Sequence, residues 1–367
     1  MKIRWYLFIV LFMVIAFLPA VTQPVIKSNW NAKWIGQPFA DAPNSFIRFS
    51  KNWELNNVPE RVLAHIAVDS KYWLWINGKL VVFEGQLKRG PTPNDTYFDE
   101  LDIAPFLKVG DNKIALLVWY WGKDGFCHKS SGKAGLLFEA AAGDSQLLSN
   151  QTWKISPHPA FLQQSAPPYP NYRLPEFNIR YDARLADGEF YKEAFSSQNW
   201  ANATELGKAG AMPWGNLWQR PIPMWYNTGL VAYESIVERS ADAGGTSIVE
   251  AVLPKNLAIT PYLEVDAPAG LLIDMRTDNY KGGSEYNVRA EYITKSGHQY
   301  FETPAYMNGH TVIYTITAGV NVRALKYRAT GYDAALQGSF YSNDAQLDTL
   351  WQKCVNTMLI NLRDAIQ

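Results

Sequence analysis

The sequence predicts a mainly β protein, with tandem jelly-roll or β-sandwich domains followed by one amphipathic helix. Between residues 30 and 225, short apolar runs of strand length are separated by Gly, Pro, Asn and Asp. A second block of such runs begins near Asn227. After Gly338 the apolar residues recur at helical spacing instead. Many short strands with regular turn signals are typical of sandwiches and jelly rolls.

The composition excludes some classes of protein and leaves others open. The chain has 367 residues, enough for two or three domains. Lys plus Arg and Asp plus Glu number 34 each, so the chain lacks the basic excess of a nucleic-acid-binding protein. Aromatic residues make up 14% of the chain. Their rings are ordinary β-core material, and they also stack on the apolar faces of sugars, so the excess fits either role.

The first residues predict export. A predicted signal peptide, 1–22, begins with Lys2 and Arg4, continues as an uncharged apolar run at 5–20 and ends on Thr22. The run is shorter than the ~20 residues of a spanning helix, so we expect cleavage rather than a membrane anchor. The expected location is the periplasm or the extracellular space, with no membrane attachment after cleavage.

Residues 23–225 are predicted to form a jelly-roll or galactose-binding-like β-sandwich region. Its strand-like runs include Ser45–Phe49, Val62–Val68, Tyr72–Ile76, Leu80–Phe83 and Lys113–Tyr120. The dipeptide Asn77-Gly78 separates two of these runs, which is a strong signal for a tight hairpin turn. Residues 226–338 are predicted to form a second β-sandwich domain. Its strand-like runs are Thr246–Leu253, Gly270–Met275, Glu285–Thr294, Val312–Thr317 and Val322–Tyr327.

Residues 339–367 are predicted to contain a long amphipathic helix. Asn343 is the expected N-cap, with Gln346 in the position of a capping-box partner. The apolar stripe that follows has to be buried against another surface. It either packs on a sandwich face or is the first helix of a truncated α-helical domain. The cysteines, Cys127 and Cys354, are expected to be free and mostly buried.

Several short motifs point to one family. In chain order they are Trp73–Lys79, Tyr97–Ile103 with Phe106–Asn112, Tyr181–Arg184, Met307–His310 and Leu325–Asp333. With these motifs the chain resembles the N-terminal, non-catalytic part of bacterial α-L-rhamnosidases. The segment 358–364 resembles the first helix of that family's (α/α)₆ catalytic barrel. The resemblance covers essentially the whole chain after the predicted signal peptide.

The resemblance implies a carbohydrate-binding and scaffolding region of an exported glycoside hydrolase that acts on plant rhamnosides. Its expected partners are a rhamnose-containing oligo- or polysaccharide and the missing (α/α)₆ barrel. An inverting glycosidase needs an acid and a base carboxylate roughly 6.5–9.5 Å apart. Neither residue of the family maps onto this sequence, so no catalytic residue is assigned and the chain alone is expected to be inactive.

Two other functions remain open. One is a complete enzyme with an unrecognised site in the β domains, in which case mutation of Asp99 or Glu100 should abolish rhamnoside hydrolysis. The other is a structural or adhesive surface protein without sugar affinity. A flat titration against rhamnose and rhamnosylated oligosaccharides would favour this last alternative.

Five residues are candidate sugar ligands. Trp121 follows a strand-like run and precedes a Gly-rich loop, so it is either core or a stacking platform. Tyr97 and Asp99 lie in a family-like motif with a dense acidic cluster. That cluster is either a sugar or Ca²⁺ site or a solvated strand edge, and no metal or cofactor is assigned. Asp182 and Arg184 have the spacing of one strand face. They either form a charge-assisted pair at the domain junction or bind sugar hydroxyls.

Overall fold

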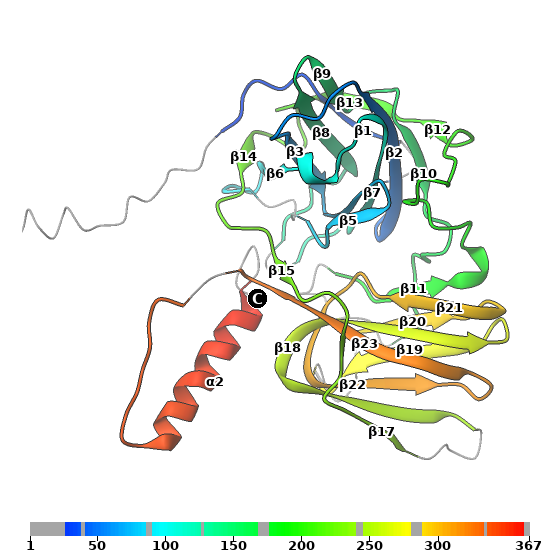
Figure 1. The fold of residues 1–367 in the computed structure, drawn as a ribbon, viewed down its shortest axis with the longest axis vertical. Helices are drawn as coiled ribbons and strands as arrows, with labels where there is room; N and C mark the ends of the chain where they lie inside the picture. Colours follow the sequence, from blue (N-terminus) through cyan, green and yellow to red (C-terminus); the bar gives the residue numbers. More distant parts are fainter. Residues whose placement is uncertain are drawn as a thin grey trace, which may run out of the picture.

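Two β units and one helix form the described part of the chain, and the mainly β prediction is confirmed (Figure 1). The computed structural model describes residues 26–37, 41–85, 90–125, 128–167, 176–239, 245–279, 288–333 and 336–362. The predicted signal peptide and Cys127 lie outside these ranges. No helix within them is long and apolar enough to cross a membrane.

The first β unit is a sandwich of two sheets. One sheet has the strand order β13-β1-β8-β3-β6-β14, with β9 beside β8, and the other has the order β12-β10-β2-β7-β4-β5. The strands are β1 (Lys33–Gly36), β2 (Ser45–Leu55), β3 (Leu63–Asp69), β4 (Lys71–Ile76), β5 (Lys79–Val82), β6 (Thr96–Asp102), β7 (Gly110–Tyr120), β8 (Gly135–Ala142), β9 (Ser145–Leu148), β10 (Lys154–Pro157), β12 (Ala201–Asn202), β13 (Thr204–Lys208) and β14 (Leu217–Gln219), with a 3₁₀ turn η2 (Ala104–Phe106).

The predicted hairpin joins β4 and β5. Asn77 and Gly78 have φ angles of 51° and 76°, the left-handed values that a two-residue turn of the mirror type requires. Asn is one of the few side-chain-bearing residues that adopt this region readily, and Gly does so without steric penalty. The local sequence therefore dictates this turn.

Strand β4 is apolar on both faces. Tyr72, Leu74 and Ile76 face the core between the two sheets of the sandwich. Trp73 and Trp75 alternate with them and pack into a second cluster that includes residues of the other β unit. The outer face of this sheet is therefore covered, and the two β units share a continuous apolar core.

The second β unit is built around the long strand β18 (Ser247–Ala267). The register between β18 and β22 shifts between Val252 and Leu257. Before the shift β18 pairs with β17, and after it with β21 and β23. The other strands of the unit are β11 (Ile179–Asp182), β15 (Tyr226–Asn227), β16 (Val231–Ala232), β17 (Ser235–Arg239), β19 (Leu272–Thr277), β20 (Arg289–Ile293), β21 (Gly297–Glu302), β22 (Met307–Ile316) and β23 (Asn321–Gly331).

Strand β11 crosses the division that the sequence suggests at residues 225 and 226. It pairs in parallel with β20, from Ile179 opposite Ala290 to Asp182 opposite Ile293. The chain then passes through the 3₁₀ turn η3 (Ala183–Leu185) and returns to the first unit for β12 to β14. Figure 1 shows β11 in the lower unit, beside strands that come from much later in the sequence. One strand of the first region thus completes the second sheet.

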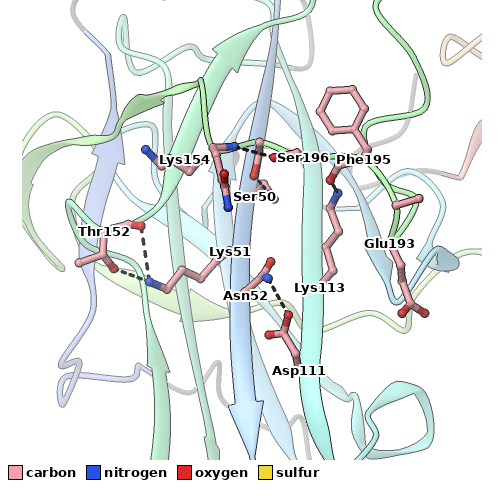
Figure 2. A pocket seen from close by; sticks show the side chains of 13 residues that line it. Ser50, Lys51, Asn52, Asp111, Lys113, Thr152, Lys154, Glu193, Phe195 and Ser196 are labelled. Atoms are coloured by element: carbon pink, nitrogen blue, oxygen red, sulfur yellow. Dashed lines mark hydrogen bonds between the residues drawn. The ribbon is translucent and has the colours of Figure 1, made fainter.

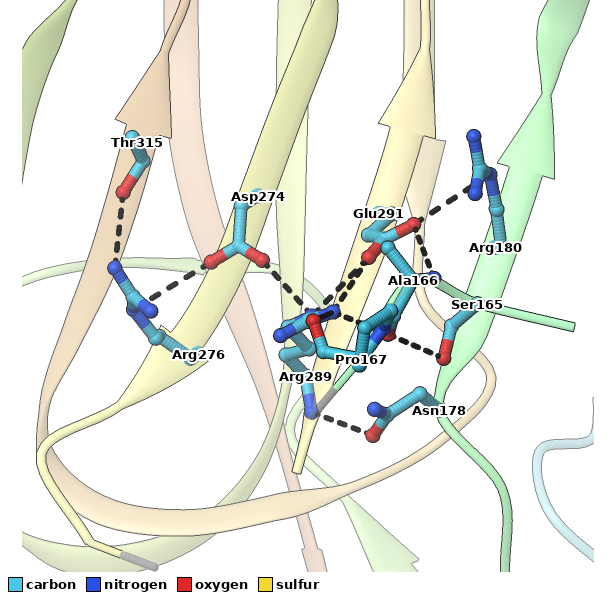
Figure 3. A network of polar contacts seen from close by, with 10 residues as sticks. All are labelled: Ser165, Ala166, Pro167, Asn178, Arg180, Asp274, Arg276, Arg289, Glu291 and Thr315. Atoms are coloured by element: carbon cyan, nitrogen blue, oxygen red, sulfur yellow. Dashed lines mark hydrogen bonds and ion pairs between the residues drawn. The ribbon is translucent and has the colours of Figure 1, made fainter. Parts of the chain in front are cut away.

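A polar network fixes the segment that leads to β11 (Figure 3). The Arg289 guanidinium donates to the carbonyl oxygens of Ala166 and Pro167 at 2.5 and 2.9 Å. It also pairs with the buried carboxylate of Glu291 at 2.8 Å. Arg180 of β11 lies 3.5 Å from the same carboxylate. The Arg289 guanidinium thus bonds to backbone and side-chain acceptors together, and it ties Ala166 and Pro167 to strand β20.

The predicted helix is α2 (Ala345–Asn361), but the predicted N-cap was wrong. Asp344 caps the helix, and its carboxylate accepts from the backbone N–H of Gln346 at 2.8 Å. No residue of α2 is buried, and Leu350 is 56% exposed. Cys354 is free but exposed, so the prediction of a buried thiol was wrong there. Figure 1 shows α2 beside the second unit, which it contacts through Asn356.

Candidate functional site

A cleft of about 570 Å³ lies between the two β units, and we call it the aromatic cleft. Rings from both units line it. They are Trp73, Trp75, Phe83, Phe161, Tyr181, Phe190, Tyr191, Tyr262, Tyr292, Tyr300 and Phe301. Concave sites with apolar walls and a few placed polar groups are typical of ligand pockets.

One wall of the aromatic cleft is held by stacking. Trp75 of β4 stacks on Tyr191, with ring centroids 4.9 Å apart and an angle of 15° between planes. Phe190 meets Trp75 edge-on at 5.7 Å. Offset-stacked and edge-to-face pairs stabilise ring positions beyond simple burial. These aromatic contacts therefore preorganise the wall.

A second wall combines aromatic and polar groups. Tyr300 of β21 is 51% exposed and stacks beside Tyr262, with centroids 6.3 Å apart. The hydroxyls of Tyr300 and Tyr191 both donate to Glu189. Burial is the largest single effect and raises the pKa of Glu189, but these two hydrogen bonds and the charges of Lys192 and Lys295 together hold the pKa below its usual value. Glu189 is thus an ionised acceptor in the cleft at neutral pH.

A salt bridge between Glu302 and Arg328 of β23 forms part of the lining of the aromatic cleft. The Arg328 guanidinium donates twice to Glu302, at 2.7 and 3.1 Å, and lies 4.6 Å from the centre of the Phe83 ring. Bidentate pairing and cation–π contact fix the planar guanidinium in one orientation. Both carboxylates that line the cleft, Glu189 and Glu302, therefore already accept strong hydrogen bonds.

His158 also lines the aromatic cleft and is neutral there. Burial, with a smaller contribution from the charge of Arg48, lowers its pKa from 6.5 to about 3. The Ala160 N–H donates to Nδ1 of His158 at 3.3 Å, which requires an unprotonated Nδ1. The cleft thus presents rings, neutral imidazole, phenols and paired charges, a set that suits a polyhydroxylated ligand with apolar C–H faces.

A second pocket, of about 430 Å³, is polar, and we call it the lysine pocket (Figure 2). Lys51, Lys113 and Lys154 line it together with hydroxyl and amide side chains. It lies on the sheet that contains β10, β2 and β7, against the segment 193–198. It shares no lining residue with the aromatic cleft.

The structure places Trp121 in the core. Its side chain has no exposed surface and lies edge-on to Trp119 and His128. The ammonium of Lys71 lies 5.0 Å from its ring centre. Protein therefore encloses this ring in the structure. Tyr97 is partly buried on β6, opposite Trp218 of β14.

Asp99 is also buried, and it has protein partners. The hydroxyl of Tyr72 donates to it at 2.8 Å, and Arg220 lies 3.2 Å away. Its neighbours in sequence diverge: Glu100 pairs with His65 at 2.9 Å, and Asp102 accepts from the Val62 N–H. Alternation along β6 places Glu100 and Asp102 on the face opposite to Asp99, so they meet different partners. Within the described ranges no group of three His, Cys, Asp or Glu side chains is arranged for a metal ion.

Asp182 and Arg184 do form the predicted charge-assisted pair. Arg184 donates through Nε at 2.9 Å and through a terminal nitrogen at 2.7 Å. These bonds hold the pKa of Asp182 below its usual value. The pair spans the end of β11 and the turn η3 rather than one strand face. None of the five candidate residues lines the aromatic cleft, and their sugar-binding roles stay predictions.

The sequence contained one signal for the aromatic cleft. In Trp73-Leu74-Trp75-Ile76 both alternating faces are apolar, which indicates a strand covered on both sides. The other walls come from Phe190, Tyr191 and Tyr300, which lie more than 100 residues from β4 in the chain. No local pattern brings these residues together.

No family model matches the sequence, and neither does any curated protein sequence. Solved structures do match. The GH78 family rhamnosidase of Bacillus sp. GL1 superposes with a TM-score of 0.77 at 16% identity, over 93% of this chain and 59% of that one. For the α-L-rhamnosidase from Dictyoglomus thermophilum the TM-score is 0.71 at 18% identity, over 93% and 40%.

The Streptomyces avermitilis α-L-rhamnosidase, solved in complex with L-rhamnose, gives a TM-score of 0.67 at 15% identity, over 89% of this chain and 32% of that one. This chain thus spans less than two thirds of the length of each enzyme. At such identities the likeness establishes the fold. The described chain has the fold of the N-terminal β-sandwich region of GH78 α-L-rhamnosidases.

Proposed function

We propose that this chain is the carbohydrate-binding and scaffolding portion of an exported α-L-rhamnosidase-like glycoside hydrolase that acts on plant rhamnosides. The observation that carries the proposal is the aromatic cleft, with rings from both β units around ionised and hydroxyl groups. L-Rhamnose has a methyl group and apolar C–H faces beside its hydroxyls. Stacked rings such as Trp75 and Tyr191 suit the methyl group and the C–H faces, and the Glu189 carboxylate suits the hydroxyls.

The proposal includes a catalytic domain that is separate from the described β units. It is supported by the apolar stripe of α2, where Leu347, Leu350 and Met358 are 47%, 56% and 47% exposed. An amphipathic helix is normally stabilised by burying this stripe. In the proposal α2 is the first helix of an (α/α)₆ barrel, and the acid and base carboxylates belong to that barrel.

The test is a calorimetric titration of the purified chain with L-rhamnose and rhamnosylated oligosaccharides. Tyr300→Ala should weaken binding about tenfold, the loss expected for one ligand-stacking aromatic. The matched control is Tyr341→Ala, which removes a ring that is 85% exposed and lies outside the cleft. Binding that survives Tyr300→Ala unchanged would remove the cleft from the proposal, whereas no binding at all would favour the structural or adhesive alternative.

Export is tested separately. The mature protein recovered outside the cytoplasm should start after Thr22, as N-terminal sequencing would show. Recovery of the full chain in the membrane fraction, with residues 1–22 intact, would contradict cleavage. This outcome would leave the sugar-binding proposal unaffected, since that proposal is argued from described residues between Trp73 and Arg328.

A further inference from the structure

The lysine pocket combines features that the aromatic cleft lacks (Figure 2). Three adjacent strands each contribute one lysine: Lys154 from β10, Lys51 from β2 and Lys113 from β7. The strand register places Lys154 opposite Ser50 and Lys113 opposite Asn52. Neighbouring strands thus bring positive charge and neutral polar groups to one pocket, a convergence that no short motif encodes.

The charges of these lysines are not neutralised by the described protein. Lys51 donates to Thr152 Oγ1 at 2.7 Å, and Lys154 donates to the Trp200 carbonyl at 3.2 Å. Lys113 is only 6% exposed and donates to the carbonyls of Lys192 and Phe195. All these acceptors are uncharged. Within the described residues no carboxylate forms an ion pair with any of the three ammonium groups.

Two carboxylates also line the pocket, against three lysines, and neither forms an ion pair with one of these lysines. Asp111 accepts from the side-chain amide of Asn52 at 2.7 Å. Glu193 pairs with Lys108, which is outside the pocket lining, at 2.6 Å. The pocket therefore keeps an excess of positive charge. Burial also lowers the pKa of Lys51 and of Lys113, which is the effect of partial desolvation on an ammonium group that lacks a nearby anion.

The other lining side chains include hydroxyl groups, amides and one aromatic ring. Ser50, Thr152 and Gln198 contribute hydroxyl and amide groups, and Phe195 contributes an aromatic side chain. The Phe195 ring centre lies 5.2 Å from the Lys113 ammonium. A small inorganic anion would use the lysines and leave the other groups and most of the volume of about 430 Å³ unused. A ligand with both a carboxylate and several hydroxyls would use all of them.

The geometry points to a binding site for an acidic sugar residue, a pyranose that carries a carboxylate. This inference rests on the proposed carbohydrate-binding function and adds a substrate class to it. The bound saccharide would contain uronic acid units in addition to deoxysugar units. The carboxylate would pair with Lys51 and Lys154, which both line the pocket and are partly exposed, while Lys113 holds the 192–195 turn beside it.

The probe is the trimer of α-1,4-linked galacturonic acid, titrated calorimetrically into the purified chain. Binding should weaken as salt is raised, since partly exposed charge pairs are screened. The double variant Lys51→Gln/Lys154→Gln should bind about tenfold more weakly. The control is Lys208→Gln/Lys255→Gln, which removes the same charge from exposed lysines outside the pocket and should bind like the wild type.

Two further ligands separate the sources of binding. The methyl-esterified trimer keeps the rings and hydroxyls but has no charge, so it should bind poorly. Inorganic sulfate keeps only the charge, so it should bind much more weakly than the trimer. Equal binding of the methyl ester, or equal affinity for sulfate, would overturn the inference, as would a double variant that binds the trimer like the control.

Failure of this inference can be distinguished from failure of the proposed function. Neutral rhamnosylated oligosaccharides are titrated in parallel, and their binding should respond to Tyr300→Ala but not to the lysine double variant. If the neutral ligands bind and the trimer does not, the lysine pocket inference fails alone. Lys51 and Lys154 are partly exposed, so we expect each variant to keep the fold. Circular dichroism and urea unfolding of each variant check this.

Discussion

Asp99 and Arg220 form an ion pair inside the first β unit, with side chains only 1% and 2% exposed. Taking two charges out of water is unfavourable, and the pair is tolerated because each charge faces the other. Tyr72 adds a hydrogen bond to the same carboxylate. These contacts give Asp99 a structural role, independent of any ligand.

We expect Asp99→Ala to destabilise the fold by about 3–5 kcal/mol, because it removes a buried carboxylate that pairs with Arg220 and accepts a hydrogen bond from Tyr72. The measurement is the free energy of unfolding in urea. Glu193→Gln is the control, since Glu193 and Lys108 are about half exposed and such pairs contribute at most about 1 kcal/mol. Equal stabilities of the two variants would contradict a buried pair at Asp99.

His158 links stability to pH. Its pKa is about 3 in the folded protein and 6.5 ordinarily, so below pH 6.5 the unfolded chain binds a proton that the folded chain does not. Its contribution to stability is therefore complete above pH 6.5 and is lost as the pH falls toward 3. The slope approaches about 1.4 kcal/mol per pH unit.

The corresponding measurement compares urea unfolding of the wild type and His158→Gln at several values between pH 7 and pH 4. Acidic groups titrate in both proteins and cancel in the comparison. The wild type should lose stability relative to the variant as the pH falls. Parallel pH profiles would show that His158 is protonated in the folded protein.

A single residue, the N-cap, sets where helix α2 begins. Asn343 and Asp344 are both good N-cap residues by type, and the capping-box spacing to Gln346 led the sequence analysis to Asn343. The structure selects Asp344, whose carboxylate reaches the Gln346 N–H and also favours the positive end of the helix dipole. Since α2 has no buried residue, its stability depends strongly on such local terms.

We expect Asp344→Ala to destabilise α2 by about 1 kcal/mol, the usual effect of losing an N-cap. Amide hydrogen exchange within Ala345–Asn361 reports this change directly, because the β units should keep their protection. Asn343→Ala is the matched control and should change exchange little. A larger effect from Asn343→Ala would return the cap to the position that the sequence pattern favoured.

Strand β11 connects the two β units. This strand belongs to the first half of the chain but lies in the sheet of the second unit. Tyr181 of β11 contacts Phe161 and Phe301 at ring distances of 4.9 Å, and it stacks on Tyr292 at 5.8 Å. These ring contacts and the hydrogen bond from Arg289 to Ala166 connect residues of the two units to each other.

We expect the two β units to unfold in one cooperative transition. Tyr181→Ala should lower the midpoint of that transition for both units, with a loss of about 3 kcal/mol from removing a packed ring. Urea unfolding followed by tryptophan fluorescence and by far-ultraviolet circular dichroism should give coincident curves. Tyr341→Ala is the control, as its ring is 85% exposed. Two separate transitions in the wild type would show that the units are independent.

Features that depend on neighbouring residues in the chain could be predicted from the sequence. It predicted the β class, the Asn77-Gly78 hairpin and the helix after Gly338, because turn geometry and side-chain alternation are local. It also offered the Asp182–Arg184 pair as one of two interpretations, and the pair forms between the end of β11 and η3 rather than on one strand face.

The residues that form the sites could not be predicted, because long-range packing brings them together. Trp121 and Asp99 are chemically suited to sugar binding, yet sheet packing buries both. The aromatic cleft and the lysine pocket instead combine side chains from strands and loops about 60 to more than 200 residues apart. Strand order and the β11 crossing set these encounters, and burial of apolar area from distant segments drives them. That driving force depends on the whole chain, so no local pattern encodes it.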